Sequence, residues 1–283
     1  MTFSIIIPTY NRDEDLESCL KSLKDNSAFN NEVIVLYNLN EKTKTICDKY
    51  GARSVFDNAR KNGKRIKSLW AILNEGIKAA KNDCVMYLND DCLVLPNWDK
   101  IAASYFEKNQ SLGLLILRTY GIGLIPEFRI GNLGPDFGNI PCANYAILNK
   151  KSGCCFDERI QWYYGDADIA LQMTVNKVYC IEETTENMVI HNHKVDENRV
   201  EHDANLYANL SDEKYFDFKW RRCCFCATGW HKRSVSSFVV KTLVLYIKYS
   251  TKYLNVLFDL SLCKIRHILK CCLMKFVKRG FVN

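Results

Sequence analysis

The N-terminal third of the chain alternates short apolar runs with segments whose apolar residues recur every three or four positions. The short runs are residues 4–7, 33–36 and 84–88, and the segments with helical spacing are 16–23 and 69–80. Short buried runs separated by amphipathic helices are typical of βαβ units. The pattern predicts an α/β fold with a mostly parallel sheet flanked by helices. Asn11 and Glu14 have the spacing of a capping box that would open the first helix.

Polar residues follow two of these apolar runs. The first run ends in Pro8-Thr9-Tyr10-Asn11-Arg12, and the third leads into Asn89-Asp90-Asp91. Ligands of open parallel sheets bind beyond the carboxyl ends of the strands. Adjacent carboxylates repel each other, and a hard divalent cation bound to phosphate oxygens would relieve that repulsion. A solvated turn that happens to carry two aspartates is the alternative interpretation.

The second half of the chain carries two further candidate groups. Asp166 follows the aromatic residues 162–164 and precedes an apolar helical segment, so it is either a helix cap or a general base beside an aromatic pocket. His191 follows an apolar run that ends near Ile190. It is either a structural histidine or a group that coordinates a cation or donates to phosphate.

In this order, the motifs resemble those of glycosyltransferase family 2, enzymes of the GT-A fold. The likeness covers about residues 3–220. It is carried by Ser4-Ile5-Ile6-Ile7-Pro8-Thr9-Tyr10-Asn11-Arg12, Asn74-Glu75-Gly76-Ile77, Leu88-Asn89-Asp90-Asp91, Phe156-Asp157-Glu158, Gly165-Asp166-Ala167-Asp168 and His191. The opening segment is the most specific of these motifs.

The resemblance implies a role for each matching residue. A divalent cation, Mn²⁺ or Mg²⁺, would be held by Asp91 and His191 and would neutralise the departing nucleoside diphosphate. Asp90 would contact the ribose or the donor sugar, and Asp166 would be the general base of a single inverting displacement. The nucleotide pocket would be lined by Pro8, Thr9, Tyr10 and Arg12.

Three positions depart from the family pattern. The second apolar run ends without the acidic pair that many members carry, so we expect Asn38 or Asn40, or Asp57 from the next strand, to bind the nucleotide instead. Leu73 stands where relatives often carry an arginine, and the basic group that includes Lys64 is expected to contact the diphosphate. Asn89 opens the metal motif in place of an aspartate.

The sequence therefore predicts an inverting transferase that moves a hexosyl or deoxyhexosyl group from a nucleoside-diphosphate sugar to a hydroxyl of a glycan or lipid-linked acceptor. The alternative is a non-catalytic nucleotide-sugar-binding scaffold with a decayed active site. A nucleotidyltransferase fits less well, because the chain lacks a Gly-rich phosphate loop with its lysine.

The expected domain organisation is a GT-A domain at 1–220, with a nucleotide half at 1–95 and an acceptor half at 96–220, followed by a basic extension at 221–283. From Lys232 onward there are eleven basic residues and one acid, although the whole chain has a net charge of +7. A basic amphipathic helix there would bind an anionic membrane surface. The alternative is a helical pair that packs on the domain.

No signal peptide and no apolar stretch of spanning length is recognised, so we expect a peripheral protein on the cytoplasmic face of a membrane. No nucleic-acid-binding module is recognised in the basic stretch, and no nucleic-acid partner is expected. Reduced thiols are expected for the 14 cysteines. The Cys223–Cys226 spacing would need a second matching pair to bind zinc.

Overall fold

The structure, a computed structural model, describes residues 1–37, 41–61, 64–123, 145–176, 178–193, 211–216 and 218–220. Contacts divide the chain into one compact unit, Met1–Phe216, and a second unit, Asp217–Asn283. The expected basic extension at 221–283, the Cys223–Cys226 group, Asn38 and Asn40 lie outside the described residues. The division into a nucleotide half and an acceptor half stays a prediction.

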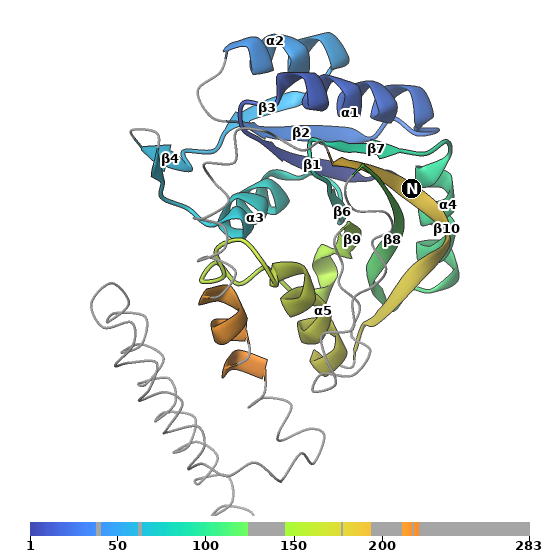
Figure 1. Ribbon diagram of the computed structural model, residues 1–283. Helices are drawn as coiled ribbons and strands as arrows, with labels where there is room; N and C mark the ends of the chain where they lie inside the picture. The colour runs from blue at the N-terminus through green and yellow to red at the C-terminus, as the bar shows by residue number, and fades with distance from the viewer. Residues whose placement is uncertain are drawn as a thin grey trace, which may run out of the picture. The chain divides into compact units, whose positions relative to one another are not determined.

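Within the described residues, eight strands form one sheet in the order β3-β2-β1-β6-β9-β8-β10-β7 (Figure 1). Neighbours β3, β2, β1 and β6 are parallel, as are β8 and β10, whereas β9 is antiparallel to β6 and β8, and β7 to β10. The sheet is therefore mixed. The strands are β1 Ser4–Thr9, β2 Glu32–Tyr37, β3 Arg53–Phe56, β6 Cys84–Tyr87, β7 Cys92–Val94, β8 Leu112–Gly123, β9 Ala146–Asn149 and β10 Cys180–His193, and a separate hairpin is formed by β4 Arg60–Lys61 and β5 Lys64–Arg65.

Helices cover both faces of the sheet (Figure 1). Their bounds are α1 Asp13–Asn26, α2 Glu41–Tyr50, α3 Leu69–Ala79, α4 Trp98–Lys108 and α5 Gly165–Asn176, with a 3₁₀ turn at Lys150–Ser152 and a short helical segment at 211–216. Helices α1, α2 and α4 contribute to one hydrophobic cluster, and α3 and α5 to the other. This arrangement confirms the predicted α/β class of helices flanking a sheet.

The side chains of β1 alternate between the two clusters. Ile5 and Ile7 belong to the cluster under α1, and Ile6 belongs to the cluster under α3. Successive residues of a strand point to opposite faces, so a strand buried on both faces reads as a continuous apolar run. Helix α3 crosses β1 closely, because a Cβ at Gly76 would lie 2.5 Å from Cγ2 of Ile6. This close approach brings the first turns of α3 to the edge of the cleft described below.

Two local expectations were wrong. Asn11 does not cap α1: it has a left-handed backbone with φ of 52°, and the capping position is Arg12, which makes no side-chain capping bond. An asparagine tolerates this conformation, and here it turns the chain so that Arg12 reaches the carboxylates after β6. His191 lies inside β10 and not after a strand, because β10 continues to His193 by pairing with β7 and β8. In the part of the chain that the structure describes, no helix is both long and apolar enough to cross a bilayer.

Candidate active site

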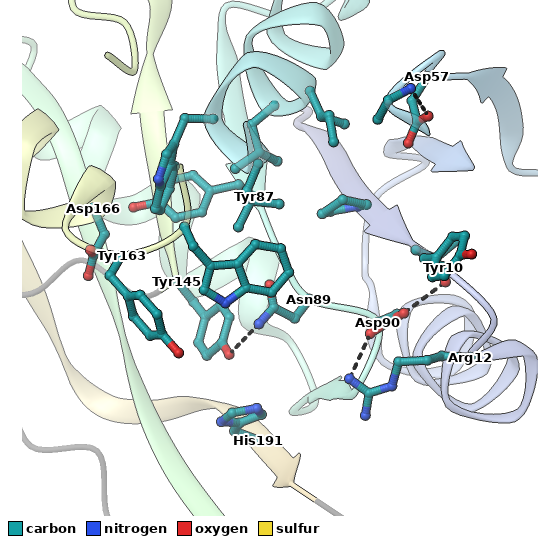
Figure 2. Close-up of a pocket in the computed structure, with 18 of the residues that line it drawn as sticks. Tyr10, Arg12, Asp57, Tyr87, Asn89, Asp90, Tyr145, Tyr163, Asp166 and His191 are labelled. Carbon is teal, nitrogen blue, oxygen red and sulfur yellow. Dashed lines mark hydrogen bonds and ion pairs between the residues drawn. The ribbon is translucent and has the colours of Figure 1, made fainter. Parts of the chain in front are cut away.

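A cleft of about 400 Å³ opens at the carboxyl ends of β1, β3 and β6. This volume lies in the range of small-molecule sites. Figure 2 shows Asp57, Tyr10 and Arg12 on one side of the cleft, Asp166 and Tyr163 on the other, and His191 between them. The lining is strongly aromatic, through Tyr10, Trp70, Tyr87, Tyr145, Trp162, Tyr163 and Tyr164.

On the β1 side, the two aspartates that follow β6 are held by residues that follow β1. The hydroxyl of Thr9 donates to Oδ2 of Asp90 at 2.7 Å. Nη1 of Arg12 lies 3.4 Å from Oδ1 of Asp90 and 3.2 Å from Oδ2 of Asp91. Burial raises the pKa of Asp90 to about 7, although Arg12 and Thr9 oppose the shift. Arg12 therefore supplies the positive charge that keeps this buried acidic pair together.

On the β10 side, the imidazole of His191 contacts the carboxylate of Asp91. Its Nε2 lies 3.2 Å from Oδ2 of Asp91, and these side chains are 8% and 3% exposed. The ring of Tyr145 packs edge-on against the imidazole, with centroids 5.7 Å apart, and the Tyr145 hydroxyl accepts from the amide of Asn89 at 3.1 Å. A buried carboxylate beside a buried imidazole is a donor set that fits a divalent transition-metal ion. Asp91, Cys92 and His191 each offer a ligand atom, and these atoms all lie within 4.8 Å of one another.

Opposite these groups, Asp166 occupies the first turn of α5. Burial raises its pKa above the usual aspartate range, although the backbone N–H groups of Asp166 and Ala167 act in the opposite direction. Its neighbour Gly165 packs directly on Trp70, so that a Cβ at this position would overlap the indole ring. Trp70 in turn packs on Phe156, with ring centroids 4.8 Å apart. The contact of α5 with α3 therefore sets where the Asp166 carboxyl lies.

A short segment near the end of the first unit holds the loop that leads into α5. The buried carboxylate of Asp212 accepts from the backbone N–H groups of Gln161, Trp162 and Tyr163 at 2.8, 2.7 and 2.9 Å. The hydroxyl of Tyr215 donates to Asp157 at 2.8 Å. These bonds fix the aromatic loop that forms the Asp166 side of the cleft.

The expected nucleotide residues lie mostly together. Pro8, Thr9, Tyr10, Arg12, Asp57 and Asp90 all line the cleft. Asp57 directly follows β3 and accepts from the backbone N–H of Ala59 at 2.7 Å. The backbone of Lys64 lies in β5, and its role toward the diphosphate stays a prediction. Asn38 cannot be compared, since it lies outside the described residues.

Sequence reasoning missed five residues at the site. Trp70, Tyr87 and Tyr145 line the cleft, Cys92 adjoins the Asp91–His191 pair, and Asp212 holds the aromatic loop. A signal was available for Cys92, because it directly follows the acidic pair. Asp212 gave none, since a lone aspartate distant in sequence says nothing about which backbone groups it will meet.

Comparison with known families finds a match to the N-terminal half of the chain. The model of the family described as glycosyl transferase family 2 matches residues 4–141. Just under half of the chain thus resembles a glycosyl transferase family 2 domain. The matched range includes β1, α3, β6 and Asp90-Asp91, but ends before Asp166 and His191. No curated protein sequence matches the chain significantly.

Two proteins of known structure share the fold. Residues 1–349 of S. aureus TarS with UDP-GlcNAc superpose with a TM-score of 0.55 at 18% identity, over 70% of this chain and 60% of that one. Glucosyl-3-phosphoglycerate synthase from Mycobacterium tuberculosis, with Mn²⁺, UDP and phosphoglyceric acid, superposes with a TM-score of 0.53 at 16% identity, over 75% of this chain and 78% of that one. The fold of the described part of the first unit is thus of the GT-A type. The chain spans only 60% of the TarS 1–349 structure.

Proposed function

We propose that the protein transfers a sugar from a nucleoside-diphosphate sugar to a hydroxyl of a glycan or lipid-linked acceptor, with a divalent cation and with inversion at the anomeric carbon. The observation that carries the proposal is the convergence of three groups on one cleft. Asp57 and the end of β1 line one wall, the pair Asp91 and His191 adjoins the floor, and Asp166 faces them from the first turn of α5. Each group serves a different part of such a reaction.

The donor would occupy the β1 side of the cleft. Asp57 and Tyr10 offer polar atoms and an aromatic face to a nucleoside, and Arg12 offers a positive charge to the diphosphate. The two structurally similar proteins were crystallised with UDP-GlcNAc and with UDP, so uracil is the first candidate base of the donor. A cation bound by Asp91 and His191 would supply electrostatic stabilisation of the leaving diphosphate.

The acceptor would enter beside the aromatic loop. Trp162, Tyr163 and Tyr164 offer apolar faces and hydroxyl groups next to Asp166. A carboxyl whose pKa is raised by burial is a better proton acceptor than an ordinary aspartate, provided that it is ionised when the acceptor binds. Asp166 would take the proton of the attacking hydroxyl in a single displacement, and no enzyme nucleophile is needed.

The proposal is tested with the variant Asp166→Asn in a transfer assay with nucleotide sugars. The amide has nearly the same shape as the carboxyl but cannot accept the proton, so we expect the rate to fall by about 10²–10⁴-fold. Nucleotide affinity should hold, because the base acts on the acceptor. Transfer by Asp166→Asn at the wild-type rate would refute this role. A wild-type protein that binds nucleotide sugars and never transfers them would support the scaffold alternative.

For residues 221–283 we propose association with an anionic membrane surface, on the cytoplasmic face. The support is the eleven basic residues against one acid from Lys232 onward, together with an apolar stripe at Leu262, Ile265, Leu269 and Phe276. A lipid-linked acceptor at that surface would give the extension a purpose.

A further inference from the structure

Cys92 is the first residue of β7, and it lies beside the proposed cation ligands. Its Sγ is 3.8 Å from Oδ1 of Asp91, and its Cα pairs with that of His191 in the antiparallel ladder of β7 and β10. The ladder bond from the N–H of Asn192 to the carbonyl of Asp91 flanks this pair. Cys92 and His191 are therefore a non-hydrogen-bonded pair, the register in which the side chains of facing residues lie closest.

The distances fit a single ion. Two ligands of one Zn²⁺, at about 2.0–2.3 Å each, can be at most about 4.6 Å apart. Asp91 lies 3.2 Å from Nε2 of His191 and 3.8 Å from Sγ of Cys92 through its two carboxylate oxygens. The ligand atoms of Cys92 and His191 are at most 4.8 Å apart. Small rotations of the buried side chains bring all three atoms within the reach of one ion.

We propose that Cys92 is a third protein ligand of the cation, so that this site holds one sulfur, one nitrogen and one carboxylate oxygen. The inference rests on the metal site of the proposed function and deepens it. Coordination requires the thiolate, and the thiol proton therefore passes to the solvent as the sulfur–metal bond forms. Sulfur and imidazole select borderline-soft ions, whereas Mg²⁺ prefers oxygen. The site is accordingly one that binds Co²⁺ and Zn²⁺ much more tightly than Mg²⁺.

The test is a cobalt titration of the full-length chain. Cys223, Cys224 and Cys226 are first changed to serine, because their thiols would also bind metal. This background protein should develop a thiolate-to-cobalt charge-transfer absorption in the ultraviolet. Adding Cys92→Ser should abolish the absorption and weaken Zn²⁺ binding by at least about ten-fold, with little change for Mg²⁺. The matched control is Cys19→Ser, another buried thiol of the same hydrophobic cluster, which should keep the absorption.

Three results would overturn the inference: cobalt bound without thiolate absorption, an absorption that survives Cys92→Ser, or no cobalt binding. If Cys92→Ser does not fold, zinc-edge X-ray absorption of the background protein shows whether a sulfur atom is bound to the ion. One sulfur at about 2.3 Å supports Cys92, and nitrogen and oxygen scatterers alone exclude it. None of these readouts uses a nucleotide. Metal-dependent nucleotide binding without sulfur ligation would overturn this inference alone, and sulfur ligation without nucleotide binding would overturn the proposed function alone.

Discussion

Nε2 of His191 and Nη1 of Arg12 both lie 3.2 Å from the same carboxylate oxygen, Oδ2 of Asp91. One group comes from β10 and the other from the turn after β1, so this single oxygen joins the two edges of the cleft. A guanidinium and a divalent cation cannot both take the closest position on it. We expect cation binding to displace Arg12 toward the cleft, where its charge becomes available to a diphosphate.

The pH dependence of the transfer rate should report the ionisation of Asp166. Burial raises the pKa of this carboxyl in the folded protein, and a general base works only when it is deprotonated. The rate should therefore fall as the pH drops through a value above the ordinary aspartate pKa of about 4. The measurement is kcat/KM for the acceptor as a function of pH, at a saturating nucleotide sugar. A rate that stays constant down to pH values near 4 would contradict a base whose pKa is raised in this way.

The variant Gly165→Ala should disturb the catalytic side of the cleft. The added Cβ would overlap the Trp70 indole, and we expect overpacking to lower the free energy of unfolding by about 1–3 kcal/mol. Transfer should fall as well, because α5 carries Asp166. Gly51→Ala is the control: it has open space and a φ of 69°, so it should cost about 1 kcal/mol and leave transfer unchanged. Wild-type stability and rate in Gly165→Ala would show that the contact is dispensable.

The variant Asp212→Asn should loosen the aromatic loop without touching the donor site. An amide has no charge and only one accepting oxygen for three backbone N–H groups, so we expect a loss of about 1.5–3 kcal/mol in unfolding free energy. The KM for the acceptor should rise, while nucleotide affinity stays constant. Glu213→Gln, at the exposed neighbouring position, is the control. An unchanged acceptor KM in Asp212→Asn would mean that the loop is held by other contacts.

The basic extension should bind anionic vesicles. Each lysine near such a surface contributes about 1 kcal/mol, and the attraction is screened by salt. Changing Lys264, Lys270, Lys275 and Lys278 to glutamine should release the full-length protein from phosphatidylserine vesicles in a co-sedimentation assay. Vesicles of neutral lipid serve as the control. If the variant and the wild type partition equally, the extension has another role.

Regular elements of the sheet were predictable because their cause is local. The runs that became β1, β2 and β6 are apolar on both faces, and the helical spacing of Leu16, Cys19, Leu20 and Leu23 became the buried side of α1. Such patterns depend on neighbouring residues alone. The start of α1 was not predictable in this way, because the conformation of Asn11 depends on the distant carboxylates that Arg12 meets.

Pairings between distant segments could not be read from the sequence. The register of β7 and β10, which sets Cys92 opposite His191, depends on how two strands separated by α4, β8, β9 and α5 meet in the sheet. The family motifs pointed to Asp91, Asp166 and His191; the last two line the cleft, and Asp91 contacts His191 beside it. They said nothing of Tyr145 or Asp212, whose roles come from tertiary contacts alone.

Calorimetric titration of the protein with UDP, dTDP, GDP and CMP, each with and without Mn²⁺, tests the central claim most directly. We predict that one nucleotide binds only with the metal, and that Asp91→Asn abolishes this binding because the variant removes a charged ligand of the ion. Asp83→Asn makes the same change at the opposite end of β6, where the carboxylate is exposed and paired with Lys151, and should bind like the wild type. No nucleotide binding under any condition, or binding that Asp91→Asn leaves intact, would contradict the account.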